Sequence, residues 1–162
     1  MPSRGLIGFQ TEFMTITSGS GLIYHSFDHY GPKFSGTVGE RVNGVMIASA
    51  QGKALAYALF NLQNRGKLML GHAEEVYEGM VIGIHSREND LTVNPLKAKQ
   101  LNNIRAAGTD ENLILTTPIR HTLEQALEFI DDDELVEVTP NHIRIRKKFL
   151  KENERKRETR KA

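Results

Sequence analysis

The stretch that most constrains the fold is ELVEVTPNHIRIRKK, which begins at Glu134. Apolar and polar residues alternate on both sides of Pro140 and Asn141, and such alternation is typical of a half-buried β-strand. Proline and asparagine favour turns. The stretch therefore predicts two antiparallel strands joined by a turn, a β-hairpin.

A capped helix is predicted just before this hairpin. Thr122 and Gln125, three residues apart, form the sequence pattern of a capping box. An apolar stripe at helical spacing follows: Leu123, Ala126, Leu127 and Ile130. The pattern predicts a helix over about 122–130, and we expect the stripe, with Leu127 in it, to pack against the rest of the protein.

The N-terminal part of the chain predicts a helix, a strand and a boundary. Apolar residues in 4–17 recur at helical spacing, and the glycines within 17–21 would end that helix. Residues 22–30 alternate between two faces, which predicts a strand. Residues 31–40 are rich in turn-forming residues, so the candidate domain boundary lies there.

Strands are also predicted for the middle of the chain. Residues 43–62 indicate two strands around a turn at Gln51 and Gly52, although alanine and leucine in the second one also favour helix. A short apolar segment at 67–70 follows. Residues 76–86 contain a further strand, with glycines as bulge positions.

A long loop and an exposed tail complete the prediction. Residues 87–112 hold no large apolar cluster, and loops of this length are usually functional or disordered. A strand is predicted at 112–116. The final residues have helix propensity but no apolar face, so we expect an exposed helix or disorder there. The sum is an α+β fold, richer in strand than in helix, with one clear late helix.

Composition places the chain among globular proteins. It has 162 residues, of which 39% are apolar, and this length suits one domain or one and a fraction. There is no cysteine, so disulfides and thiolate sites are excluded. No apolar run approaches the roughly 18 residues that span a membrane. We therefore expect a soluble, cytoplasmic protein without a membrane partner.

The charge is divided unevenly along the chain. Residues 142–162 carry ten Lys or Arg and three Glu, a net charge of +7, whereas the preceding residues carry 11 basic and 17 acidic residues, a net charge of −6. A basic tail can attract a polyanion. A solvated terminal helix explains the same residues equally well, so the charge alone leaves both interpretations open.

The sequence gives little support for catalysis or metal binding. The phosphate-binding pattern GxxxxGK[ST] and the nucleophile pattern GxSxG are both absent from the chain. His25 and His29 lie on a predicted strand, where they would be some 13 Å apart at about 3.3 Å per residue. The carboxylates at 131–134 follow a helix end, where a solvated acidic corner is a better interpretation than a cation contact.

Nucleic-acid binding has more support, because flexible cationic segments suit phosphate backbones. The candidate RNA-binding residues lie in the long loop and at the hairpin's end. Stacking platforms are scarce there, so we expect recognition of structured RNA by charge and shape. The candidates are Lys97, Lys99, Arg105, Arg144, Arg146, Lys147, Lys148 and Lys151.

Long strings of the sequence resemble the C-terminal part of the BipA/TypA translational GTPase family. The most specific are EVYEGMVIGIHSRENDLTVN and TLEQALEFIDDDELVEVTP. The resemblance implies that residues 1–35 are the last helix and strand of an elongation-factor-G-like fifth domain with a ferredoxin-like fold. It implies that residues 36–162 are the C-terminal domain peculiar to the family, with the basic tail.

The resemblance also implies a function at the ribosome. In the family this domain reaches the ribosomal A site, and its long loop, here about 89–108, approaches the tRNA acceptor end and large-subunit ribosomal RNA. The family acts in large-subunit assembly and in adaptation to cold and stress. Its GTPase domain, with GTP and magnesium, lies upstream, so we expect no enzyme activity and no cofactor in this chain.

Two further expectations concern protein contacts. The strand at 22–30 would have an open edge, and open edges invite pairing, so we expect residues 1–35 to be displaced, swapped or to mediate a dimer. The alternative to RNA binding is a protein-interaction module that docks on ribosomal proteins or other factors. Salt dependence separates the two, because phosphate contacts give a steep slope.

Overall fold

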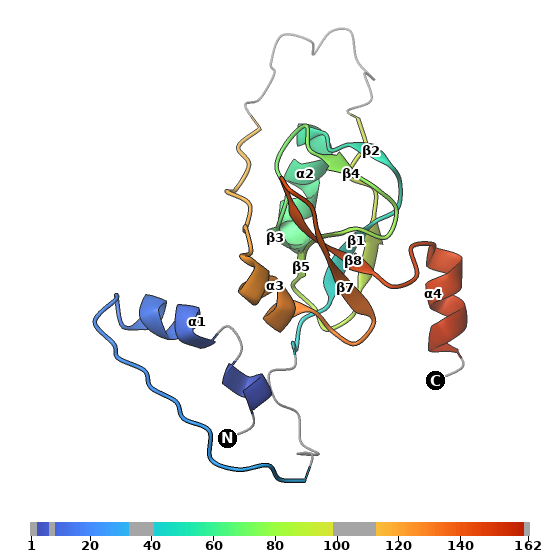
Figure 1. Ribbon diagram of the computed structural model, residues 1–162. Coiled ribbons are helices and arrows are strands. Elements are labelled where there is room, and N and C mark those ends of the chain that lie inside the picture. The colour runs from blue at the N-terminus through green and yellow to red at the C-terminus, as the bar shows by residue number, and fades with distance from the viewer. Residues whose placement is uncertain (1–2, 7–8, 33–40, 99–112, 161–162) are drawn as a thin grey trace, which may run out of the picture.

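The computed structural model describes residues 3–6, 9–32, 41–98 and 113–160. Its centre is a four-stranded sheet in the order β3-β5-β1-β6 (Figure 1). The strands are β1 (Val45–Ala48), β3 (Gly66–Leu68), β5 (Val81–His85) and β6 (Leu91–Val93). β5 pairs antiparallel with β1 and β3, whereas β6 pairs parallel with β1.

Strand β1 has apolar cores on both of its faces. Met46 and Ala48 belong to one buried cluster, and Val45 and Ile47 belong to another. Side chains alternate across a strand, so an uninterrupted apolar run is what a strand covered on both faces requires. The protein is therefore built in layers around this strand.

Helix α2 (Ala56–Leu62), followed by the 3₁₀ helix η2 (Gln63–Arg65), covers the first face. Leu59 and Leu62 of α2 join the same cluster as Met46. The second predicted strand of 43–62 is therefore wrong: only β2 (Gly52–Lys53) is extended there, paired with β4 (Glu75–Val76). The helix preference of alanine and leucine prevailed, because α2 can bury its apolar side on the sheet.

The second face is covered by the late helix and the hairpin, and both predictions are confirmed. Helix α3 (Leu123–Phe129) begins at Thr122 with the complete capping box to Gln125. β7 (Glu134–Val138) and β8 (Ile143–Lys147) pair antiparallel in full register. The second cluster, which holds Val45 and Ile47, is completed by Ala126 of α3 and Ile145 of β8.

Gly79 lets the hairpin approach β5 closely. The backbone N–H of Lys147 donates to the Gly79 carbonyl at 2.9 Å, and Met80 pairs with Arg146 in an isolated bridge. Gly79 has φ +86°, and a Cβ added there would lie 2.6 Å from the Leu150 Cα. A side chain at this position would therefore strain the backbone and collide with the segment that follows β8.

The N-terminal helix is present, but the strand after it is not. η1 (Ser3–Leu6) and α1 (Phe9–Ile16) account for the described part of the predicted helix at 4–17. Residues 22–30, predicted as a strand, form no helix or strand, and their large apolar side chains are exposed except for the half-buried Ile23. A strand needs backbone hydrogen bonds to a neighbour, and no described residue pairs with this segment.

The sequence predictions for the long loop and the tail have mixed outcomes. β6 lies inside the predicted loop of 87–112, of which residues 99–112 are outside the described part. The predicted strand at 112–116 is wrong, because residues 113–116 are not in a strand. α4 (Glu152–Thr159) is an exposed helix, as expected for the tail. Among the described residues, no helix is long and apolar enough to cross a membrane.

The structure corrects the expectation for the α3 stripe, because Leu127 is 49% exposed while Leu59 of α2 is fully buried. Leu59→Ala should lower the free energy of unfolding by about 2–5 kcal/mol, since it removes buried methyl groups and leaves a cavity. Leu127→Ala should lower it by less than about 1 kcal/mol. Urea denaturation of both variants checks this, and equal losses would contradict the layered core.

Candidate nucleic-acid interface

The predicted basic residues of strand β8 lie on two opposite faces of the strand. Arg144 and Arg146 are half-buried on the face that looks away from the second apolar cluster. Lys147 shares the inner face with Ile145 and is buried. Because side chains alternate along a strand, one basic stretch of sequence divides into surface cations and an interior cation.

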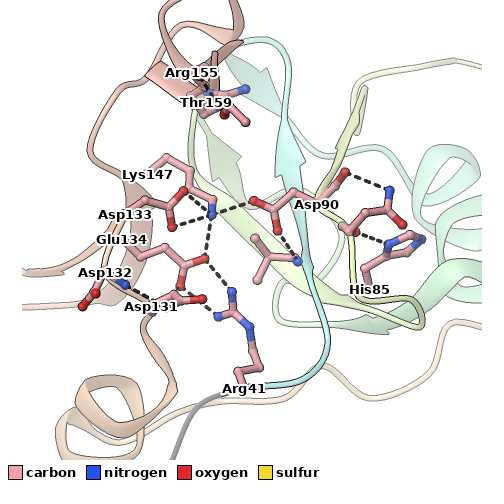
Figure 2. A network of polar contacts seen from close by, with 12 residues as sticks. Arg41, His85, Asp90, Asp131, Asp132, Asp133, Glu134, Lys147, Arg155 and Thr159 are labelled. Atoms are coloured by element: carbon pink, nitrogen blue, oxygen red, sulfur yellow. Dashed lines mark hydrogen bonds and ion pairs between the residues drawn. The ribbon is translucent and has the colours of Figure 1, made fainter. Parts of the chain in front are cut away.

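The ammonium group of Lys147 is enclosed by carboxylates (Figure 2). Its Nζ lies 2.6 Å from Asp90 Oδ2, 2.8 Å from Asp133 Oδ2 and 3.0 Å from Glu134 Oε1. Burial alone would lower its pKa, but these carboxylates raise the pKa of Lys147 above its ordinary value. With 2% of the residue exposed, Lys147 has no accessible charge for a phosphate, so we remove it from the predicted RNA-binding residues.

Glu134 is held by a second cation, Arg41. The two guanidinium Nη atoms donate to Glu134 Oε2 and Oε1 at 2.9 and 2.8 Å, and the same group lies 4.5 Å from the centre of the Phe129 ring. Burial would raise the pKa of Glu134, but Arg41 and Lys147 hold it below its ordinary value. The solvated acidic corner predicted at 131–134 is therefore wrong for Glu134, whose carboxylate makes the cation contacts.

Asp90 connects this ion cluster to the sheet. Its Oδ1 accepts from the backbone N–H of Val45 at the start of β1, while Oδ2 contacts Lys147. Arg41 adds a hydrogen bond to the Phe129 carbonyl at the end of α3. We call Arg41, Asp90, Asp133, Glu134 and Lys147 the ion cluster. It joins the start of β1, the end of α3 and the base of the hairpin.

The outer face of the hairpin keeps its cations near the surface. Arg144 Nη1 lies 3.9 Å from Glu137, which also accepts a hydrogen bond from the Tyr77 hydroxyl at 2.6 Å. Burial, followed by the bond to Glu137, raises the pKa of Tyr77. Within the described residues, the Arg146 guanidinium donates to the Lys147 carbonyl through Nη1 at 3.3 Å. Both guanidinium groups therefore keep donors for a further anion.

The remaining candidates lie at two other places. Lys148 and Lys151 are exposed between β8 and α4, so they continue the basic surface of the hairpin. Lys97 is exposed and follows Leu96, which packs over Gly52 of β2. Lys99 and Arg105 lie outside the described residues. The structure thus groups four candidates at the hairpin and α4: Arg144, Arg146, Lys148 and Lys151.

Other chemistry finds little support in the geometry. Within the described residues, no group of three or more His, Asp or Glu side chains is arranged to hold a metal ion. His25 and His29 lie in the segment without secondary structure, and His29 contacts Asp28 at 2.9 Å. The sequence did not reveal Arg41 or Asp90, because their partners are distant in the chain and no local pattern marks them.

The fold defines this chain as an α+β domain in which a capped helix and a hairpin cover one face of a mixed sheet. Residues 43–152 match the family model of the TypA/BipA C-terminal domain. The match covers more than half of the chain, which therefore belongs to the TypA/BipA family. Arg41, which completes the ion cluster, lies just before the matched residues.

Curated relatives agree with this assignment. The large ribosomal subunit assembly factors BipA of Escherichia coli K12, Salmonella typhimurium and Haemophilus influenzae are 67%, 66% and 64% identical to this chain. Each alignment covers 99% of this chain and 26% of the relative. The chain therefore spans about a quarter of the length of these relatives.

The ion cluster predicts a pH-dependent stability. Because the pKa of Glu134 is lowered from its ordinary 4.5, its contribution is complete above pH 4.5 and is lost as the pH falls through the folded-state pKa. Glu134→Gln should cost about 3–5 kcal/mol at pH 7, since it leaves the Arg41 guanidinium without its carboxylate partner and removes one of the three carboxylates around Lys147. The difference in unfolding free energy between this variant and the natural chain should become smaller below pH 4.5, because Glu134 becomes protonated there.

Urea unfolding across pH 3–8 measures this difference. Asp132→Asn is the matched control, because Asp132 is an exposed neighbour of the cluster, and it should change the stability by no more than about 0.5 kcal/mol. Equal effects of the two substitutions at pH 7 would contradict the described cluster.

Proposed function

We propose that this chain is the ribosome- and RNA-binding C-terminal part of a translational GTPase that acts in large-subunit assembly. The observation that carries the proposal is the group of surface cations at the hairpin and α4. The names of the relatives, which are large ribosomal subunit assembly factors, supply the biological setting.

The physical basis is phosphate binding by surface cations. Lys148 and Lys151 are exposed, and Arg144 and Arg146 keep donors at the surface. Each cation that neutralises a phosphate releases condensed counterions, so several together give an affinity that falls steeply with salt. Helix α4 extends this surface with Lys156 and Arg157 in its last turn, although Lys156 also pairs with Glu152.

The finer assignments belong to the same proposal. Residues 36–162 form the family-specific domain, and residues 1–35 close an elongation-factor-G-like domain whose other elements lie upstream. The domain reaches the ribosomal A site in the cytoplasm. Its segment around Lys97, Lys99 and Arg105 contacts the tRNA acceptor end and ribosomal RNA. GTP and magnesium are bound upstream of this chain, where hydrolysis takes place.

A second candidate function, protein interaction, is supported by the exposed apolar residues of 21–32. Leu22, Tyr24, Phe27 and Tyr30 are largely exposed, although aromatic and aliphatic side chains usually gain free energy from burial. A protein partner or a second copy of this segment would cover them. Such contacts respond weakly to salt, which separates this function from RNA binding.

Co-sedimentation with large ribosomal subunits over about 50–300 mM salt tests the proposal. We expect saturable binding whose logarithm falls linearly with the logarithm of the salt concentration. Replacing Lys148 and Lys151 together by alanine should reduce the slope by about 0.7–0.9 for each lost phosphate contact. The same substitutions at Lys97, Lys99 and Arg105 test the loop separately.

The matched control is Lys67→Ala, which removes an exposed cation from β3, away from the hairpin end. It should leave the slope unchanged. Binding with a flat salt dependence would contradict RNA binding and favour the protein-interaction module, and no binding at any salt would contradict an independent ribosome-binding role for this chain.

A further inference from the structure

A groove of about 750 Å³ opens beneath the turn of the β7–β8 hairpin. Met69, Met80 and Ala126 line it on the side of the sheet and α3, and Val138 and Ile143 line it on the side of the hairpin. This volume lies within the range typical of sites for small organic ligands. Among the predicted RNA-binding residues that the structure describes, only Arg144 lines this groove.

The hairpin leaves apolar surface uncovered on its inner face. Val136 and Ile145 form a register pair that packs into the second apolar cluster. The next pair on the same face, Val138 and Ile143, remains 60% and 40% exposed. Burying these side chains against a flat apolar partner would be favourable. Methionine thioethers, such as those of Met69 and Met80, adapt to ring-shaped partners.

Arginine and histidine side chains line the rim of the groove: Arg120, His121, His142 and Arg144. Glu74 is the one acidic residue in the described lining, and both of its oxygens accept hydrogen bonds from Arg120. Arg120 and Glu74 therefore balance each other's charge, while Arg144, which lies 3.9 Å from Glu137, keeps donors for an anion. The His121 ring stacks on Phe129 with centroids 5.1 Å apart, so one wall of the groove is supported by the same ring that Arg41 covers.

We propose that this groove binds one unpaired nucleotide of RNA, with the base on the apolar floor and the phosphate at the arginine rim. The inference rests on the proposed RNA-binding function and gives it a specific site. An unpaired base has the flat apolar faces that the floor accommodates, and histidine rings and arginine planes are common stacking partners for bases. A cationic peptide is a less suitable ligand, because Glu74, the acidic residue of the described lining, is already bonded to Arg120.

Methionine methyl NMR tests the proposal, because the four described methionines separate the groove from the rest of the chain. Met69 and Met80 line the groove, whereas Met14, on α1, and the fully buried Met46 do not. A short 5′-phosphorylated single-stranded oligoadenylate should shift the methyl signals of Met69 and Met80 in a saturable manner. Those of Met14 and Met46 should stay unchanged, and inorganic phosphate alone should not reproduce the shifts.

Val138→Trp is the variant that fills the groove, and Val42→Trp, at a residue 73% exposed and outside the lining, is its matched control. We expect the first to weaken oligoadenylate binding by about tenfold or more, the loss typical of removing one stacked base. The control should bind like the natural chain. Arg120→Gln, which alters an exposed rim residue, should also weaken binding without filling the groove.

Large-subunit co-sedimentation of the same variants separates this inference from the function on which it rests. If the natural chain did not bind the subunits at all, the proposed function would be refuted. Intact, salt-dependent subunit binding with no methyl shifts from the oligonucleotide would refute the groove alone. If Val138→Trp weakened subunit binding while the oligonucleotide left Met69 and Met80 unmoved, the groove would contact the subunit through something other than an unpaired nucleotide, and the nucleotide proposal would be wrong.

Discussion

The contact between Arg41 and Glu134 is the interaction on which the second layer of the domain depends. Glu134 is at the base of the hairpin, and its carboxylate is shared between Arg41 and Lys147. Asp90 extends the contact to the first residue of β1. A buried ion pair is stable only when its remaining donors and acceptors are also satisfied. The charged residues of the ion cluster come from four separate segments of the chain. Their contacts therefore also fix the position of the hairpin on the sheet.

This arrangement explains why neighbouring basic residues have different roles. Lys147 supports the hairpin from inside, while Arg146 and Lys148 on either side of it remain toward the surface. The strand period of two residues produces this division. The same hairpin holds the cationic surface on its outer face and at its end, and the groove under its turn. Both proposed nucleic-acid contacts therefore depend on how firmly the ion cluster fixes the hairpin.

Local patterns predicted the parts of the fold that local chemistry determines. The capping box at Thr122 needs only residues within one helical turn, and the hairpin needs only its own alternation. The strand predicted at 22–30 failed because pairing depends on a neighbour, which no local pattern supplies. Arg41 and Glu134 are 93 positions apart, so only the folded chain reveals their contact. The same limit applies to the candidate site, because the sequence could list the basic residues but could not show that Lys147 is buried.

A double-mutant cycle between Arg41 and Glu134 tests the central claim most directly. The unfolding free energies of Arg41→Ala, Glu134→Ala and the double variant give the coupling between the two side chains. Residues that share one ion network couple by about 0.5–3 kcal/mol, and the account predicts a value in the upper part of this range. The exposed pair of Glu152 and Lys156 should show about 0.3–0.5 kcal/mol. A coupling between Arg41 and Glu134 that is no larger than this would contradict the account.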